Sequence, residues 1–222
     1  MVLPKFTRLP RHIGVIPDGN RRWAEQRGLR KGDGYTYGIS PGVQLCQLCL
    51  DLGIEELTYY GFTEDNTKRP AEQRMAFQQA CVDAVKSAAH LDTALLVVGD
   101  DSSPMFPSEL KPYRTRQVHG SGRLKANFLV NYDWHWDLSQ ALINMDGSRS
   151  RKSFKECIGS ADVSRIDLLI RWGGRRRLSG FLPVQTVYTD IYVLDELWPD
   201  FTLDQFFEAL RWYEAQDVTL GG

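Results

Sequence analysis

The sequence predicts an α/β fold: a single domain over residues 1–222, with a central, mostly parallel six-stranded sheet flanked by helices. Three observations lead to this prediction. Short apolar runs alternate with helical patterns from one end of the chain to the other. No repeat, low-complexity run or Gly/Ser linker divides the chain, and 222 residues suffice for one sizeable core. Strands that alternate with helices form right-handed crossovers, which produce parallel pairs covered on both faces.

Each predicted strand is a short apolar run that ends in a polar or glycine-bearing turn. The first strand, at residues 11–16, leads into a Pro-Asp-Gly-Asn turn. The other five are expected at residues 56–62, 94–99, 124–131, 166–171 and 190–193. Helices are expected at residues 21–28, 40–51, 70–89 and 203–216. Pro70 suits the first turn of the third helix.

Charge and composition exclude several classes of protein. The chain has 27 Lys and Arg residues against 28 Asp and Glu, a net charge of −1, so it has no overall electrostatic reason to bind nucleic acid or an anionic membrane. No run approaches the roughly 20 apolar residues of a membrane span. The first residues also lack the apolar core of a signal peptide. We expect a cytoplasmic protein with no nucleic-acid partner and no stable membrane insertion.

The four cysteines are too few for a disulfide framework in a chain of this length. Cys46 and Cys49 have the spacing of a redox or metal motif, but no second pair accompanies them. They also lie in an apolar helical pattern, so we expect them to pack in the core.

Polar segments directly follow four of the predicted strands. They are Asp18 and residues 63–69, 131–136 and 171–177. Ligands of open parallel sheets bind outside the carboxyl ends of the strands. The sequence therefore predicts that four distant segments converge on one cleft.

Arginine dominates this predicted cleft and indicates an anionic ligand, because guanidinium groups match phosphate oxygens bidentately. The turn from Asp18 to Asn20 opens a helix, whose free N–H groups add a second phosphate-binding element. A carboxylate among such groups is repulsive unless a divalent cation lies between, so Asp18 is a candidate Mg²⁺ ligand. The arginines concerned are Arg21, Arg22, Arg69, Arg171, Arg175, Arg176 and Arg177.

Other ligand-binding patterns do not stand out in the sequence. There is no glycine-rich nucleotide fingerprint, no metal spacing among the four histidines and no Ser, His and Asp triad. The apolar and aromatic surroundings of the predicted cleft favour a lipid diphosphate over a sugar.

Five sequence blocks resemble the motifs of the cis-prenyltransferases, the undecaprenyl diphosphate synthase family. They follow the family's order and span nearly the whole chain. The first is HIGVIPDGNRRWA at residues 12–24. The others are GFTEDNTKRP at 61–70, NYDWHWD at 131–137, DLLIRWGGRRRLSGF at 167–181 and LWPDF at 197–201.

This resemblance implies a homodimer that joins isoprenyl diphosphates with Mg²⁺, beside a hydrophobic tunnel between the sheet and two helices. Asp18 would bind Mg²⁺, with Asn20 and Arg22 beside it as catalytic residues. Asp190 stands where the family has a glutamate associated with the metal of the dimer partner. Arg21, Lys31, Tyr35 and Arg69 would lie at the first diphosphate, and Arg171, Arg177 and Ser179 at the second. The other substrate-binding residues implied by the resemblance are Gly19, Trp23, Phe62, Thr63 and Asn66.

Departures from the family pattern gather around both diphosphate sites and argue against ordinary elongation with isopentenyl diphosphate. Near the first site, Arg21 replaces a Gly, Lys31 an Arg and Tyr35 a His. Thr219-Leu220-Gly221 stands where the family carries Arg-x-Gly. The remaining departures are Glu64 for a small hydroxyl residue, Thr67 for Trp, Asp133-Trp134-His135 for Gly-Gly-Arg, Trp172 for Thr and Arg175 for Glu.

Two hypotheses for the product follow, with dimethylallyl, isopentenyl or geranyl diphosphate as substrates. Residues 70–99 look shorter than in long-chain members and carry Gln78, Gln79 and Asp83, which favours a short product. Arg21, residues 33–35 and Pro183 resemble the lavandulyl and cyclolavandulyl diphosphate synthase branch, which indicates irregular, head-to-middle coupling.

Two alternatives remain open. A terpene-cyclase-like activity would use one diphosphate, whereas Arg171, Arg177 and Ser179 favour two diphosphate sites. A non-catalytic partner subunit would lose the Asp-Gly-Asn signature and keep Arg-x-Gly, and this chain has the reverse pattern.

Overall fold

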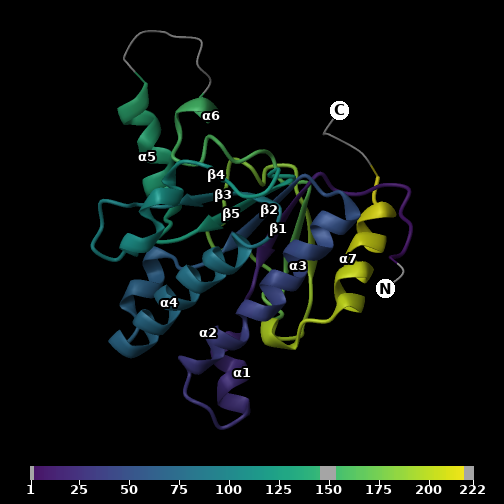
Figure 1. The fold of residues 1–222 in the computed structure, drawn as a ribbon, viewed down its shortest axis with the longest axis horizontal. Helices are drawn as coiled ribbons and strands as arrows, with labels where there is room; N and C mark the ends of the chain where they lie inside the picture. The colour runs from purple at the N-terminus through teal and green to yellow at the C-terminus, as the bar shows by residue number, and fades with distance from the viewer. Residues whose placement is uncertain (1–2, 146–153, 218–222) are drawn as a thin grey trace.

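Seven strands form the central sheet, in the order β4-β3-β5-β2-β1-β6-β7 (Figure 1). The computed structural model describes residues 3–145 and 154–217. The strand bounds are β1 His12–Ile16, β2 Glu56–Tyr60, β3 Thr93–Val98, β4 Gln117–Val118, β5 Leu124–Leu129, β6 Leu168–Arg171 and β7 Asp190–Val193. All pairs are parallel except β3 with β4. The predicted α/β class and mostly parallel sheet are confirmed.

The predicted count of six strands was one too low, because β4 was missed. This strand has only two residues, Gln117 and Val118, and both are exposed at the edge of the sheet. It pairs antiparallel with Ala94 and Leu95 of β3. A strand so short has no apolar run, so periodicity cannot detect it.

Helices cover both faces of the sheet. One face carries α3 (Ile39–Leu52), α4 (Ala71–Ala88) and α7 (Leu203–Glu214), which lie side by side in Figure 1. Their apolar side chains, such as Leu45, Val85 and Phe206, form one core cluster with the strands. The other face packs against Trp136 of α5 (Trp134–Asn144) and the segments around Ile166 and Phe181, while α5 and α6 (Phe154–Cys157) form a further small cluster with each other.

The four predicted helices are present with small shifts at their ends. The first, α1 (Asn20–Gln26), lies close to its expected range. Gly53 ends α3 in the left-handed region, with φ of 76°, and a Thr202–Gln205 capping box begins α7. The last helix ends at Glu214, two residues before the predicted end.

The sequence did not predict several short helices. These are α2 (Asp33–Tyr37), α5, α6 and the 3₁₀ turns η1 (Glu64–Lys68), η2 (Ser108–Arg114) and η3 (Trp198–Asp200). The start of α5 has a readable signal, because the Asp133 carboxylate caps it by accepting from the Trp136 N–H at 3.1 Å. The sequence predicted these residues only as a polar segment that follows a strand.

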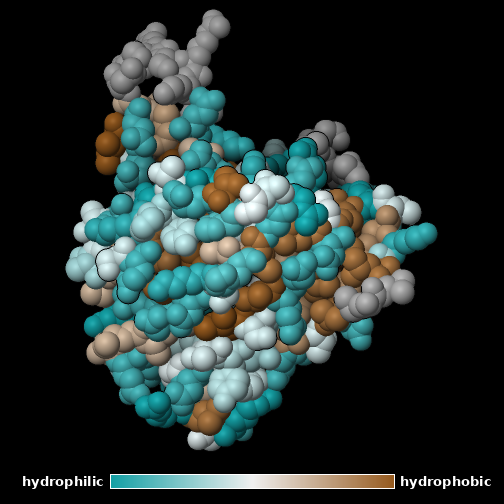
Figure 2. All heavy atoms as spheres, viewed as in Figure 1, coloured by the Kyte–Doolittle hydropathy of each residue, from teal (hydrophilic) through white to brown (hydrophobic). Residues whose placement is uncertain are grey.

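The cysteines are buried and free, as predicted for Cys46 and Cys49. Burial raises the pKa of the Cys46 thiol to about 12 and raises that of Cys49 as well. Such thiols are inert packing groups. Figure 2 shows apolar side chains between polar ones on the face of α3, α4 and α7. No described helix combines the length and the apolar composition that a membrane crossing requires.

Candidate active site

The turn after β1 places the first predicted site residues at the carboxyl end of the sheet. Gly19 has φ of 112°, a value that favours glycine, and a Cβ there would lie 2.8 Å from the Leu197 side chain. Helix α1 then begins at Asn20 with no side-chain cap. Asn20 is buried: its Nδ2 donates to the Pro17 carbonyl at 2.9 Å, and its Oδ1 has no partner among the described residues.

Asp18 lies between two arginines that come from different parts of the chain. Arg171 Nη2 donates to Asp18 Oδ2 at 2.9 Å, and Arg22 Nη2 lies 3.5 Å from Oδ1. Sheet pairing explains the first contact, because Arg171 is the last residue of β6 and pairs with Ile16 of β1. Arg22 also donates to the Gly173 carbonyl at 2.9 Å.

Arg171 links Asp18 to the loop that carries the second predicted diphosphate group. Its Nη1 donates to Ser179 Oγ at 2.9 Å and to the Arg177 carbonyl. The Arg171 side chain is 5% exposed, and its buried Nε has no partner among the described residues. Ser179 has φ of 54°, a strained conformation for a residue with a side chain.

These groups line a cleft with a volume of about 460 Å³ and an excess of positive charge. Two carboxylates, Asp18 and Asp65, face six guanidinium groups. The arginines are Arg21, Arg22, Arg69, Arg171, Arg175 and Arg177. Guanidinium groups that outnumber carboxylates in this way are suited to bind phosphate oxygens.

An apolar wall closes one side of the cleft. Tyr35 stacks on Phe77 with ring centroids 4.4 Å apart and planes 3° apart. Arg69 Nη1 donates to the Tyr35 hydroxyl at 2.7 Å, and its guanidinium lies over the Phe77 ring. Burial raises the pKa of Tyr35, so its hydroxyl stays neutral. The wall therefore has a charged rim and an apolar body.

Behind this wall lies an apolar cavity of about 80 Å³ between the sheet and helices α3 and α4. Helix α4 contributes Phe77 and a stripe of small side chains at helical spacing. The stripe consists of Ala80, Cys81, Ala84 and Ala88. The cavity and the cleft meet along Pro17, Asn20, Tyr35, Tyr60, Gly61 and Phe77.

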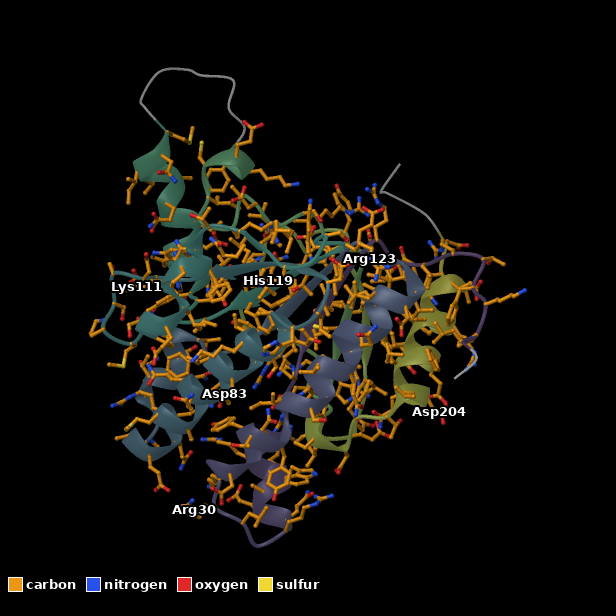
Figure 3. The ribbon with its side chains drawn as sticks, in the orientation of Figure 1. Arg30, Asp83, Lys111, His119, Arg123 and Asp204 are labelled. Carbon is orange, nitrogen blue, oxygen red and sulfur yellow. The ribbon has the colours of Figure 1, made fainter. Side chains whose placement is uncertain are left out.

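The polar residues of α4 do not bear on this cavity, which corrects their use as evidence for a short product. Gln79 Nε2 donates to the Asp83 carboxylate at 2.9 Å, and Gln78 donates to the Met105 carbonyl. None of the three lines the cavity. Asp83 is labelled on α4 in Figure 3.

A second polar pocket, of about 540 Å³, adjoins the cleft. Its own walls include Glu64, Lys68 and the start of α5 at Asp133, Trp134 and His135. It shares Tyr60, Thr63, Asp65, Arg177 and Ser179 with the cleft. The expectation that four segments converge on one cleft is thus corrected: three reach the cleft, and residues 132–135 line the pocket beside it.

Some predicted binding residues do not line the cleft. Trp23 is buried and donates to Asp200 Oδ1 at 2.7 Å, while Lys31 pairs with Glu25 at 2.8 Å. Phe62 is fully buried and packs edge-on against Phe77. A direct role for these three in substrate binding stays a prediction.

Two other residues expected at the site lie outside the cleft. Arg176 does not line it, and its Nη2 lies 3.9 Å from Asp195 Oδ1. Asp190 begins β7 and pairs with Leu168, at the opposite end of the strands from Asp18. Thr219-Leu220-Gly221 lies outside the described residues.

Tyr60, Asp65 and Phe77 line the cleft but were not singled out in the sequence. Asp65 lies within the polar segment 63–69 that follows a predicted strand, and Tyr60 lies near the end of that strand. Phe77 could have been found from its helical spacing to Ala80, Cys81 and Ala84.

The donor set at Asp18 fits one particular use of a divalent cation. Within residues 3–145 and 154–217, no group of three or more His, Cys, Asp or Glu side chains could hold a metal ion. Mg²⁺ is commonly held by one or two carboxylates and completed by substrate phosphates. A single partly exposed carboxylate beside Arg171, whose Nε has no partner among the described residues, matches that arrangement.

Comparison with known proteins identifies the family of this chain. Residues 16–221 match the family model described as putative undecaprenyl diphosphate synthase. An isoprenyl transferase of Nitrosomonas europaea is 32% identical over 99% of this chain and 88% of its own length. A ditrans,polycis-undecaprenyl-diphosphate synthase, (2E,6E)-farnesyl-diphosphate specific, of Pectobacterium atrosepticum is 31% identical over 96% of this chain and 90% of its own length.

A solved structure has the same fold. Lavandulyl diphosphate synthase from Lavandula x intermedia, in complex with dimethylallyl diphosphate, superposes with a TM-score of 0.83 and 22% identity, covering 96% of this chain and 99% of that one. Together with the family model, which spans most of the chain, these matches identify it: the protein belongs to the undecaprenyl diphosphate synthase family of prenyltransferases.

Proposed function

We propose that this protein condenses two short isoprenyl diphosphates, with Mg²⁺, into a short-chain and irregularly coupled prenyl diphosphate. The observation that carries the proposal is the cleft itself, in which arginines from both ends of the chain surround one carboxylate beside a small apolar cavity. A diphosphate with a short hydrocarbon tail has the charge and the polarity to occupy both parts.

Two groups of donors support two diphosphates rather than one. Asp18, Arg21 and Arg22 line the cleft together with Arg69, which contacts Tyr35 and Phe77 where the cleft meets the apolar cavity. Arg177 and Ser179 lie on the other side, where the cleft meets the second polar pocket. Arg171 lies between the groups and contacts both Asp18 and Ser179.

Mg²⁺ bound by Asp18 would supply neutralising charge to the diphosphate that leaves. The remaining work falls to the protein's own side chains. Arg22 and Arg171 would hold the leaving diphosphate, and Arg177 and Ser179 would orient the second substrate. The stacked rings of Tyr35 and Phe77 would exclude water from the allylic carbon and place π-faces beside its developing positive charge.

The chemistry needs no covalent intermediate with the protein. The allylic C–O bond breaks and its electron pair leaves with the diphosphate. The alkene of the second substrate supplies the electron pair of the new C–C bond, and a proton is then lost.

A short product is supported by the size of the apolar cavity. A volume of about 80 Å³ has room for only a few water-sized groups. The bulky Tyr35 and Phe77 side chains stand where the cavity meets the cleft. Dimethylallyl diphosphate is the first substrate to test, because it is bound in the solved structure with the same fold.

The test is an Mg²⁺-dependent assay of the purified protein with dimethylallyl diphosphate alone, and then with isopentenyl diphosphate added. We expect product from dimethylallyl diphosphate alone, with ten carbons after removal of the diphosphate. A five-carbon product would indicate ionisation without coupling. Product that requires isopentenyl diphosphate would mean regular elongation and would overturn irregular coupling.

We also propose that the protein is a homodimer. Leu142 and Ile143 of α5 are 81% and 72% exposed, and a brown patch stands on this helix in Figure 2. Val187 and Tyr188, next to Asp190, are exposed as well. Apolar side chains gathered on a surface in this way are typical of protein interfaces, and a second copy is the commonest partner.

Light scattering after gel filtration tests the dimer. We expect twice the chain mass for the natural protein and the single chain mass for the double variant Leu142→Glu, Ile143→Glu. Met75→Glu is a matched control, because Met75 is 65% exposed on α4, away from α5. A monomeric natural protein would refute the proposal.

A further inference from the structure

The second polar pocket contains a carboxylate–histidine pair that takes no part in the proposed binding of the two diphosphates. His135 Nδ1 lies 3.2 Å from Asp133 Oδ1 at the start of α5. The other oxygen of the same carboxylate, Oδ2, accepts from the Trp136 N–H at 3.1 Å. Asp133 is therefore held by the helix terminus, and it is 21% exposed while His135 is 69% exposed.

This contact fixes the tautomer of His135 in its neutral form. A carboxylate accepts hydrogen bonds, so the Nδ1 beside it carries the proton. The Nε2 atom then keeps a lone pair and can act as a base. A carboxylate that orients a histidine in this way is a recurring arrangement in general base catalysis.

The pair is joined to the site of the second substrate. Trp134 stacks on His135 with ring centroids 3.6 Å apart. Trp134 also packs on Gly180, where a Cβ would lie 2.8 Å from the indole Cδ1. Gly180 follows Ser179, and Ser179 and Arg177 line both the pocket and the cleft.

We propose that His135 is the proton acceptor of the coupling reaction and that Asp133 is its positioning residue. The inference rests on the proposed function, because it assigns the last step of that reaction. After the C–C bond forms, the second isoprenyl unit carries a tertiary cation. The electron pair of a C–H bond next to the cation becomes the new C=C bond, and the proton moves to Nε2. The resulting imidazolium faces Asp133 and returns its proton to solvent.

The other ionisable groups of the pocket are less suited to this step. The Tyr60 hydroxyl donates to the Ser179 carbonyl at 2.7 Å, and the Tyr132 hydroxyl donates to Asp137 at 2.7 Å. Asp65 is paired with Lys68 at 2.6 Å. Carboxylates such as Glu64 are in general weaker bases than imidazole near neutral pH.

The experiment compares His135→Ala, Asp133→Asn and a matched control, His90→Ala, in the full-length protein. His90 is an exposed histidine beyond the end of α4, at the amino end of β3 and far from the cleft. Turnover of dimethylallyl diphosphate is measured alone and with isopentenyl diphosphate, together with the affinity for dimethylallyl diphosphate. Removal of a general base typically costs about 10²–10⁴-fold in rate, and we expect His135→Ala to fall by this amount with unchanged affinity.

Two readouts separate a proton acceptor from a structural residue. Added imidazole should restore turnover to His135→Ala but not to Asp18→Ala. Substrate deuterated at the carbon that loses the proton should show a larger isotope effect in His135→Ala than in the natural protein. The labels are dimethylallyl diphosphate with both methyl groups deuterated, and isopentenyl diphosphate deuterated at C2.

Asp133→Asn sharpens the assignment. An amide has one acceptor oxygen where the carboxylate has two, so it cannot serve both the Trp136 N–H and the His135 Nδ1–H. If the side-chain oxygen of the variant amide still accepts from the Trp136 N–H, its N–H₂ group faces His135 Nδ1. Nδ1 must then accept, so the proton moves to Nε2 and Nε2 can no longer act as a base. We expect a rate loss close to that of His135→Ala, and an unchanged isotope effect in both variants would refute the inference.

The outcomes distinguish the two proposals. Natural protein that couples dimethylallyl diphosphate, with His135→Ala equally fast, overturns the proton acceptor and leaves the proposed function standing. Natural protein that consumes neither substrate overturns the proposed function, and the inference fails with it. A loss of turnover in His90→Ala as large as in His135→Ala would also overturn the assignment.

Discussion

The two ends of strands β1 and β2 hold polar side chains in opposite ways. At the amino end, His12 Nε2 accepts from the Thr58 hydroxyl at 2.8 Å, and Asn127 donates to Thr58 and to Glu56 at 2.9 and 2.7 Å. His12 Nδ1 lies 3.1 Å from the Ser164 carbonyl. Each polar side-chain atom of His12, Thr58 and Asn127 has a partner there.

At the carboxyl end, the buried Asn20 Oδ1 and Arg171 Nε lack partners among the described residues. A buried polar network whose members are all satisfied stabilises a fold and specifies its packing. Buried donors and acceptors that stay unsatisfied are costly and call for an explanation, which a bound ligand supplies. The satisfied cluster around His12 is therefore structural, and the unsatisfied Asn20 and Arg171 are candidates for contact with a ligand.

The largest expected effect lies at the carboxyl end. Asp18→Ala should lower turnover by about 10³-fold, or roughly 4 kcal/mol of transition-state stabilisation, because it removes the proposed Mg²⁺ ligand. The melting temperature should change little, since Arg171 keeps Ser179 and the Arg177 carbonyl. Steady-state kinetics and thermal unfolding measure both, with the exposed Asp51→Ala as control. Retained turnover would refute the assignment of Asp18.

At the amino end, we expect a loss of stability without a loss of turnover. Glu56→Ala should lower the free energy of unfolding by about 2–4 kcal/mol, because it leaves the buried Asn127 amide and Ser164 N–H without their acceptor. The turnover number of the folded protein should be unchanged. Urea unfolding measures the loss. Its neighbour Glu55 is the control, since Glu55 lies on the surface and pairs with an exposed Arg11.

A smaller effect concerns pH. Burial lowers the pKa of His12 below 6.5, so the folded protein keeps this imidazole neutral while the unfolded chain binds a proton. The stability that comes from the neutral His12 is fully present above pH 6.5. The free energy of unfolding should fall as the pH drops below 6.5, because the unfolded chain then binds a proton that the folded protein does not. Uptake of one proton by the unfolded chain changes the free energy of unfolding by at most about 1.4 kcal/mol per pH unit. Unfolding at several pH values should show a flatter slope for His12→Asn, and an unchanged slope would exclude His12 as the source.

Sequence reasoning predicted the sheet well because most of the parallel strands are buried apolar runs between turns, although β7 is only partly buried. It also located Asp18, Arg69 and Arg171 at the cleft, because Arg171 ends such a run and Asp18 and Arg69 lie in the polar segments that follow one. The edge strand β4 had no comparable signal, since its two residues are exposed.

The side-chain directions around the site could not be derived in the same way. Trp23 and Phe62 lie in motifs that reach the cleft, yet both side chains turn into the core. Residues 132–135 follow β5, but Asp133 begins a helix and carries Trp134 and His135 into a neighbouring pocket. Tertiary packing decides such directions, and the spacing of residues along the chain does not reveal it.

The pairing of Ile16 with Arg171 has a consequence for how this family can diversify. Side chains alternate between the faces of a strand, so a shift of one residue in β6 would turn Arg171 to the opposite face. A single insertion or deletion within β6 should therefore break the contact between Asp18 and Arg171, whereas the loops beyond the strand ends can change length without moving it. We expect new substrate preferences to arise in those loops, while the pairing of β1 with β6 keeps Asp18 and Arg171 together.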